Sequence, residues 1–184
     1  MTDYGASSYH RFLQGDQSGL EELVRLYGDA LVRFAYCFLS DSDAAEDVME
    51  DTFATLIVKR KKFTKEAKFK TYLFSIARNK CIDVIRYKKR VVPLNYKAGD
   101  VVKGDPESDV ILSERNKLIY LCLQQLNEEY RNVLHLVYFE GFDIPEVSAI
   151  LHKSRKQVYN LLARAKAHLK EILLKAGIEN ENLF

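Results

Sequence analysis

The sequence predicts an all-α protein of two small helical domains joined by a flexible linker. Apolar residues recur at spacings of three and four along most of the chain, which is the helical period. No segment alternates between apolar and polar residues for long enough to indicate a strand. The aperiodic stretch 91–108 contains two glycines and two prolines, so we interpret residues 93–108 as the linker between residues 1–92 and residues 109–184.

The composition is that of a folded protein in a reducing compartment. The hydrophobic fraction of 47% is ordinary for a globular chain. Cys37, Cys81 and Cys122 lie far apart in apolar helical patterns, which indicates buried free thiols rather than a disulfide or a zinc site. No apolar signal region opens the chain, and no apolar run reaches the ~18 residues of a membrane helix. We therefore expect a cytoplasmic protein without membrane insertion.

Capping residues indicate where the helices of the first domain begin. Residues 18–39 predict one long helix, or two in line, with Gly28 as a local weak point. Asp43 and Glu46 have the form of a capping box, which predicts the start of the next helix. Opposite its apolar face, that helix carries three carboxylates, those of Asp47, Glu50 and Asp51.

The sign of the charge reverses within this domain. Residues 1–58 hold 3 Lys or Arg against 11 Asp or Glu, a net charge of −8, whereas residues 59–90 hold 13 against 2, a net charge of +11. Residues 59–68 have no apolar period and predict a basic loop, after which Phe69–Arg90 predicts a basic helix. A negative and a positive surface on one unit indicate two different partners.

The second domain contains the sharpest local pattern. Asn127 predicts the cap of a helix that ends at Gly141. Two capping pairs with a two-residue turn between them follow: Asp143 with Glu146, His152-Lys153, and Ser154 with Gln157. Two helices joined by a tight turn, the second long and basic, form the helix-turn-helix layout.

The second of these helices has a basic outward face. Residues 151–175 hold 7 Lys or Arg against 1 acid, a net charge of +6. The outward side chains that can reach base edges or phosphates in a major groove are Arg155, Lys156, Tyr159, Asn160 and Arg164.

Each feature also has a plain structural explanation. The helix-turn-helix could be a helical hairpin with a solvated basic face. The acidic face and the basic run Lys59–Lys62 could each be a solvated surface, and Asn79 by itself indicates nothing. The functional interpretation depends on their order: acidic helix, basic-aromatic loop, basic helix, linker, helix-turn-helix.

Short motifs follow this order from residue 9 to residue 175. They are Leu26-Tyr27, Ala45-Glu46-Asp47-Val48, Phe53, Phe69-Lys70-Thr71-Tyr72-Leu73, Ile76-Ala77-Arg78-Asn79, Leu126-Asn127-Glu128-Glu129-Tyr130-Arg131, Tyr138-Phe139-Glu140-Gly141 and Arg164-Ala165-Lys166. In this order and spacing the chain resembles the extracytoplasmic function (ECF) group of RNA polymerase sigma factors.

The resemblance implies a transcription initiation factor whose partners are core RNA polymerase and promoter DNA. In that family the acidic helix docks on the clamp helices of the β′ subunit, here through Asp47, Glu50 and Asp51. The early helices of the second domain meet the β flap, and its recognition helix reads the −35 element through the outward face described above. The −10 element is read and melted by the stretch Lys62–Arg90. Its candidate contacts are Lys62, Phe63, Lys68, Ser75, Asn79 and Arg86. The resemblance also admits an anti-sigma protein as a partner.

Strand opening needs a basic channel with aromatic platforms on which bases can stack. Four aromatic side chains are candidates, those of Phe63, Phe69, Tyr72 and Phe74. Phe69 also falls on the apolar stripe of its helix, which makes it a candidate core residue that braces the loop.

Three departures from the family pattern stand out. Ile57 and Tyr72 stand where the family often has Trp, and Glu50 stands where it often has Gln. The turn of the helix-turn-helix has His152-Lys153 in place of Gly and an apolar residue. A residue other than Gly in a left-handed conformation costs about 1 kcal/mol, although His is among the tolerated residues.

Two other classes of protein compete with this interpretation. A polymerase-independent helix-turn-helix regulator is the alternative, but it would leave the acidic helix unexplained. An enzyme acting on DNA would need a metal cluster, a catalytic triad or a phosphate-binding loop, and the four histidines are scattered. We therefore expect no catalytic residue, no metal and no cofactor.

Overall fold

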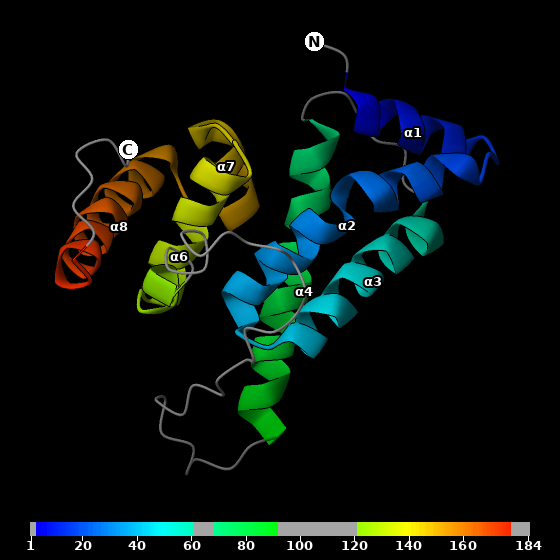
Figure 1. Ribbon diagram of the computed structural model, residues 1–184. Helices are drawn as coiled ribbons and strands as arrows, with labels where there is room; N and C mark the ends of the chain where they lie inside the picture. The colour runs from blue at the N-terminus through cyan, green and yellow to red at the C-terminus, as the bar shows by residue number, and fades with distance from the viewer. Residues whose placement is uncertain (1–2, 61–67, 92–120, 178–184) are drawn as a thin grey trace.

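The computed structural model describes residues 3–60, 68–91 and 121–177, and every regular element in these ranges is helical (Figure 1). The elements are α1 (Tyr4–Leu13), α2 (Ser18–Leu39), α3 (Ser42–Lys59), α4 (Phe69–Val91), α6 (Glu128–Leu134), the π-helical segment η1 (His135–Phe139), α7 (Ile144–Leu151) and α8 (Arg155–Lys175). The all-α class is confirmed. The expected linker, residues 93–108, lies outside the described residues, so the domain boundaries stay a prediction.

Helices α1 to α4 form a first unit around an aromatic core. α2 packs against α1, α3 and α4, and α3 also packs against α4. Phe34 of α2 is fully buried, with its ring 5.0 Å from that of Phe38 and 5.1 Å from that of Phe74 on α4. Of the two alternatives for residues 18–39, one long helix or two in line, the structure has the first: α2 continues through Gly28. None of the helices in the described part of the chain is long and apolar enough to cross a membrane.

Helix α1 was not anticipated from the sequence, and one carboxylate holds its start. Asp3 is its N-cap, and Asp3 Oδ1 accepts a hydrogen bond from the Ala6 N–H at 3.0 Å. The second oxygen, Asp3 Oδ2, accepts from the Phe69 N–H at 2.8 Å. The same side chain therefore caps α1 and the first turn of α4, 66 residues further along the chain.

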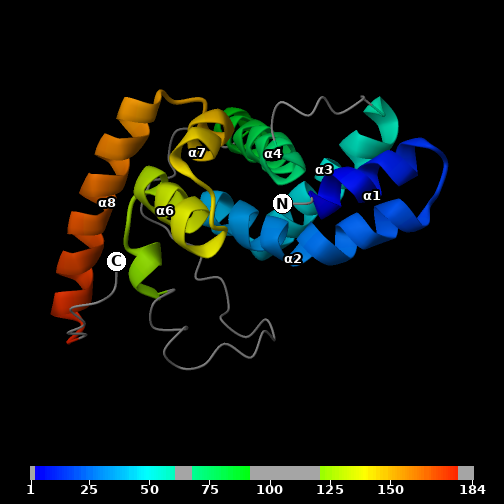
Figure 2. The same ribbon diagram turned by 90° about the horizontal axis from the view of Figure 1, so that it is seen from above.

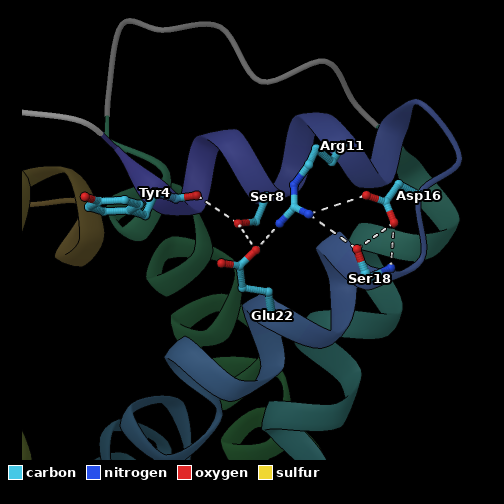
Figure 3. A network of polar contacts seen from close by, with 6 residues as sticks. All are labelled: Tyr4, Ser8, Arg11, Asp16, Ser18 and Glu22. Atoms are coloured by element: carbon cyan, nitrogen blue, oxygen red, sulfur yellow. Dashed lines mark hydrogen bonds and ion pairs between the residues drawn. The ribbon is translucent and has the colours of Figure 1, made fainter.

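A polar network ties α1 to α2 (Figure 3). Glu22 of α2 accepts a hydrogen bond from the Ser8 hydroxyl at 2.8 Å and pairs with the guanidinium of Arg11. Arg11 also reaches Asp16 at 3.4 Å and Ser18 at 3.3 Å in the turn between the helices. The carboxylate of Asp16 in turn accepts from Ser18, which lowers the pKa of Asp16.

The predicted start of α3 is wrong by two residues. Asp41, not Asp43, is the N-cap, and its Oδ1 accepts from the Ala44 N–H at 3.1 Å. Its other oxygen accepts from Lys88 Nζ of α4 at 2.7 Å, and this hydrogen bond lowers the pKa of Asp41. The sequence Asp41-Ser42-Asp43 offers three residues that cap helices well. Of the three, Asp41 is the residue that also pairs with Lys88.

Helices α6, α7 and α8 form a second unit, in which the predicted caps are confirmed. Asn127 caps α6, and the side-chain and backbone bonds of both capping boxes are present at α7 and α8. The helix expected to continue to Gly141 changes instead to the wider π-helical turn after Leu134. His152 ends α7 in the left-handed conformation, with a φ of 52°.

The two units lie side by side and share one apolar core (Figure 2). α4 packs against α7, and α2 packs against α6 and η1, whereas α8 lies on the side of the second unit away from α3. Cys37, Cys81 and Cys122 are buried free thiols, as expected. Burial raises the pKa of Cys81 to about 12, so this thiol is inert at neutral pH.

The two glycines of α2 offer a matched test of the contact between α1 and α2. A Cβ at Gly19 would lie 2.3 Å from the carbonyl oxygen of Ser8, whereas the nearest atom to a Cβ at Gly28 is a Val24 methyl at 3.9 Å. Gly19→Ala should lower the free energy of unfolding by about 1–3 kcal/mol, because backbone must move. Gly28→Ala should raise it by about 0.5–1 kcal/mol through helix propensity. Urea denaturation measures the free energy of unfolding of both variants. Equal changes in the two variants would contradict the close contact between Gly19 and the backbone of α1.

The left-handed residue between α7 and α8 allows a second test. His152→Gly should raise the free energy of unfolding by about 0.5–1 kcal/mol, because Gly adopts a positive φ without strain. Lys153→Gly is the control: its φ is not positive, and it loses the 2.7 Å ion pair with Glu129. The control should be destabilised in the same urea titration. A loss of stability in both variants would show that His152 is not strained.

Candidate nucleic-acid interface

The acidic face of α3 is presented as predicted. Asp47, Glu50 and Asp51 are exposed, whereas the opposite face of the helix is buried against α2 and α4. Thr52 on the buried face satisfies its hydroxyl by donating to the Val48 carbonyl at 2.7 Å. Asp51 also contacts the second charged surface of this unit, because its Oδ2 lies 3.1 Å from Lys80 Nζ on α4.

Three of the candidate −10 residues share one face of α4. Ser75, Asn79 and Arg86 follow at spacings of four and seven, so they lie on one side of the helix. The Ser75 hydroxyl is half-buried and donates to the Thr71 carbonyl at 2.8 Å. Asn79 is exposed, and its Oδ1 accepts from the Arg78 guanidinium at 3.3 Å, which leaves the amide nitrogen to offer a base.

Lys68 opens this face just before α4 and is not free. Its Nζ lies 3.1 Å from Glu146 Oε1 of α7, and the hydrogen bond to Glu146 raises the pKa of Lys68. The other two candidates of the −10 set, Lys62 and Phe63, lie outside the described residues.

Burial excludes two of the four aromatic candidates from stacking on a base. Phe69 and Phe74 are fully buried, so neither ring can stack on a base, and Phe69 is the core residue that the apolar stripe also indicated. The Phe69 ring lies 5.1 Å from that of Tyr9 of α1 and thereby fixes the start of α4. Tyr72 is half-buried, and burial raises the pKa of its hydroxyl.

The second unit presents the predicted basic face on α8. All five outward side chains are exposed: Arg155, Lys156, Tyr159, Asn160 and Arg164. The opposite side of the helix is held in the core by Val158, Ala165 and Leu169. The Ser154 capping box and the left-handed His152 set the direction in which α8 leaves α7. The arrangement offers cations, an amide and a phenol along one helix, which suits a major groove.

A set of charged residues between the two units could not be predicted from the sequence. Lys70 of α4 lies 2.8 Å from Glu140, and Thr71 donates to Glu146 at 3.0 Å. Glu140 belongs to a motif of the second domain, but neither its spacing nor its neighbours connect it with a residue 70 positions earlier. Among the described residues no group of His, Cys, Asp or Glu side chains could hold a metal ion.

Two family models match this chain, one in each helical unit. Residues 23–91 match the model of sigma-70 region 2, and residues 116–169 match that of sigma-70 region 4. The first range covers most of α2 and all of α3 and α4, and the second covers α6, η1, α7 and α8 as far as Leu169.

Two curated relatives extend over nearly the whole chain. RNA polymerase sigma factor NccH of Alcaligenes xylosoxydans xylosoxydans is 31% identical over 175 residues, which cover 91% of this chain and 94% of NccH. ECF RNA polymerase sigma factor SigM of Bacillus subtilis is 27% identical over 163 residues, 88% of this chain and 99% of SigM.

Two solved structures have the same fold. CnrH, in complex with the cytosolic domain of CnrY, superposes with a TM-score of 0.67 at 25% identity and covers 94% of this chain and 98% of CnrH. Sigma factor RpoE of Bartonella quintana, in complex with the anti-sigma factor NepR, has a TM-score of 0.66 at 24% identity and covers 83% of this chain and 95% of RpoE. The relatives favour polymerase-dependent initiation over an independent helix-turn-helix regulator. The chain belongs to the ECF group of RNA polymerase sigma factors, transcription initiation factors that bind core polymerase and direct it to promoters.

Proposed function

We propose that three helices divide the work of initiation: α3 docks core polymerase, α4 selects the −10 strand and α8 reads the −35 duplex. The observation that carries the proposal is that each helix buries one complete side and exposes a charged side of the sign its partner needs. Charges that serve only solubility would not need to be sorted by sign onto separate helices.

The acidic face of α3 is the proposed docking surface for the clamp helices of the β′ subunit. Asp47 and Glu50 are exposed, and Asp51 needs only to leave a surface ion pair with Lys80. Such pairs contribute ~0–1 kcal/mol, so exchanging Lys80 for a cation of the polymerase costs little. The early helices of the second unit are proposed to contact the β flap.

The proposed −10 surface is the exposed side of α4 with the residues before it. Lys68 and Arg86 supply charge near its two ends, and Asn79 supplies an amide between them. Lys62 and Phe63 remain proposals from the sequence alone. With Phe69 and Phe74 buried, Phe63 is the aromatic candidate of the basic segment for stacking, and Tyr72 is half-buried.

The proposed −35 surface is the outward face of α8. Its N-terminal residues, Arg155 and Lys156, follow directly on the Ser154 cap, where a recognition helix contacts base edges. Arg164 lies two turns further along and suits a phosphate or a guanine.

Partners beyond polymerase and DNA follow from the relatives. The solved CnrH and RpoE structures are complexes with CnrY and with the anti-sigma factor NepR. We extend this to the present chain, for which an anti-sigma protein is a further proposed partner. Since core polymerase and promoters are in the bacterial cytoplasm, the proposed place of action is the cytoplasm, and no catalytic step or cofactor is assigned to the chain.

Charge reversal tests the docking surface. Asp47→Lys with Asp51→Lys should weaken binding to core polymerase by at least about 100-fold, because like charges across an interface cost several kcal/mol. Glu21→Lys with Asp29→Lys, on exposed positions of α2, changes the net charge equally and is the control. Fluorescence anisotropy of labelled chain titrated with core polymerase measures both. Normal binding by the α3 variant, or an equal loss in the control, would refute the assignment.

Two substitutions on α4 separate base reading from charge. In holoenzyme, Asn79→Ala should abolish the preference for one base of a single-stranded −10 oligonucleotide and leave the salt dependence unchanged. Arg86→Ala should have the opposite effect. The slope of the logarithm of the binding constant against the logarithm of the salt concentration should fall in magnitude by about one, and the base preference should stay. Binding to oligonucleotides with each base at each position, at several salt concentrations, measures both effects. An unaltered base preference in Asn79→Ala would remove Asn79 from the −10 set.

A further inference from the structure

The first turn of α4 has no capping side chain of its own. The Tyr72 N–H donates to the Lys68 carbonyl at 3.2 Å, so Lys68 stands where Ser, Thr, Asp or Asn usually caps a helix. A lysine side chain has donors only and cannot accept from the N–H groups of the first turn. The acceptor comes instead from Asp3, whose Oδ2 lies 2.8 Å from the Phe69 nitrogen. The helix with the proposed −10 surface is therefore capped from outside its own segment.

The same carboxylate also begins a second helix. Asp3 Oδ1 accepts from the Ala6 N–H at 3.0 Å, and the Asp3 carbonyl accepts from the Ser7 N–H at 3.1 Å. Each of these contacts belongs to the first turn of α1. Because the two oxygens of a carboxylate are joined in one rigid group, the first turns of α1 and α4 are held in a fixed position relative to each other.

Packing around Gly5 brings these two turns close together. A Cβ at Gly5 would lie 2.5 Å from the Tyr27 hydroxyl oxygen and 2.7 Å from Cδ1 of Phe69, so α1 approaches this closely because the residue is glycine. Phe69 is fully buried, and its ring lies 5.1 Å from that of Tyr9 and 6.1 Å from that of Tyr27. The backbone of Phe69 is thus held by Asp3 and its side chain by aromatic packing.

The other end of α1 contacts the residue that ends α3. Arg60 is the C-cap of α3, in the left-handed conformation with a φ of 39°. Its guanidinium carbon lies 5.3 Å from the centre of the Phe12 ring, in the last turn of α1. α1 has 10 residues and is about 15 Å long. It lies at the end of the first unit where α3 ends and α4 begins (Figure 1). Its two ends therefore contact both residues, Arg60 and Phe69, that flank the basic stretch of the sequence.

α1 is itself fixed on α2. The Glu22 carboxylate accepts from the Ser8 hydroxyl at 2.8 Å and pairs with the guanidinium of Arg11 (Figure 3). The close approach of Gly19 to the Ser8 carbonyl sets the separation of the two helices. α1 is therefore a fixed reference for the start of α4, and the proposed division of the work of initiation gives it no role.

Reading a base requires such a reference. A side chain that selects a ligand must be held within about 0.5 Å of its productive position. Asn79 lies on the same helix as Phe69 and about 15 Å further along it. A shift or rotation of the first turn of α4 therefore moves Asn79, and it moves Lys68 directly.

We propose that Asp3 is a positioning residue for −10 recognition: it fixes the start of α4 against α1 and thereby places Lys68 and Asn79, without touching DNA itself. This rests on the proposed −10 role of α4. Without the link, α4 samples positions that do not fit the strand, and the affinity falls in proportion to the fraction of molecules in the fitting position. Charge by itself has the opposite effect, because removing an acid beside a DNA surface strengthens binding to every strand.

One substitution removes the link to α4 and keeps the cap of α1. Asp3→Asn still caps α1, because Asn is as good an N-cap as Asp, but its amide has one acceptor oxygen where the carboxylate has two. Asp41→Asn is the matched control. Asp41 also caps its own helix with Oδ1 and reaches α4 with Oδ2, but it does so at Lys88, towards the other end of α4. The two variants change the net charge equally.

A second variant moves α1 without any change of charge. Gly5→Ala places a methyl group against Tyr27 and Phe69, so the first turns of α1 and α4 must separate. Circular dichroism measures the helix content of every variant, and anisotropy measures its binding to core polymerase. Both quantities should match those of the wild type, because neither the fold of α3 nor its acidic face is altered.

The decisive measurement compares two labelled single strands on holoenzyme. One carries the −10 sequence that wild-type holoenzyme selects from a random pool, and the other has the same bases in shuffled order. Asp3→Asn should bind the selected strand about tenfold more weakly, the lower end of what a hydrogen bond to a charged group contributes, and the shuffled strand within about twofold of the wild type. Gly5→Ala should lose affinity for the selected strand in the same way, and Asp41→Asn should match the wild type on both strands.

The other outcomes overturn the proposal. Tighter binding of both strands by Asp3→Asn would show that Asp3 acts by charge alone. Equal losses on both strands, or the same loss in Asp41→Asn, would show a general loss of order. If Asp3→Asn loses helix content, Gly5→Ala decides the matter. Wild-type holoenzyme separates the two proposals: if it does not prefer the selected strand over the shuffled one, the −10 role of α4 is wrong. If it does and both variants keep that preference, only the role of Asp3 is wrong.

Discussion

The structure depends on the way α4 is packed on two sides. On one side it joins the first unit, where the ring of Phe74 meets that of Phe34 and Lys80 pairs with Asp51 of α3. On another side it receives the second unit, and the same Phe74 ring meets Phe142. What remains exposed is a stripe that includes Asn79. One helix thus has a core face, a face for the second unit and the exposed face that we propose for nucleic acid, and any change of its orientation moves all three.

Much of this fold could be predicted from the sequence, because local chemistry decides it. The capping boxes at Asp143 and Ser154 are local, and both formed as expected. The start of α3 was missed because three adjacent residues could cap it, and a distant lysine distinguishes them. Helix α1 was missed because its cap, Asp3, also accepts a hydrogen bond from the distant Phe69 N–H, and no local pattern shows that contact. The π-helical turn at His135 has no signal in the apolar period of the sequence.

Some features of the candidate site could likewise be predicted from the sequence, and others could not. Exposure of Asp47 or Arg164 follows from helical spacing and could be predicted, and both are on the surface. Burial of Phe69 and Phe74 could not be separated from a base-stacking role, because an aromatic residue near a basic loop suits either. The pairing of Lys70 with Glu140 lay beyond reach, since no local pattern relates residues so far apart. What the sequence conveys is which side chains are available; which of them are already engaged depends on the tertiary structure.

The capping of α4 by Asp3 bears on how the protein is made. A nascent chain grows at about 5–20 residues per second, so the third residue waits roughly 3–13 s for its partner 66 residues later. The second unit is synthesised later still, and until then the side of α4 that carries Phe74 and Lys70 has no cover from it. Until then the ring of Phe74 lacks its edge-to-face contact with Phe142. The lysine beside that ring keeps a charge on the uncovered surface, which disfavours aggregation between nascent chains.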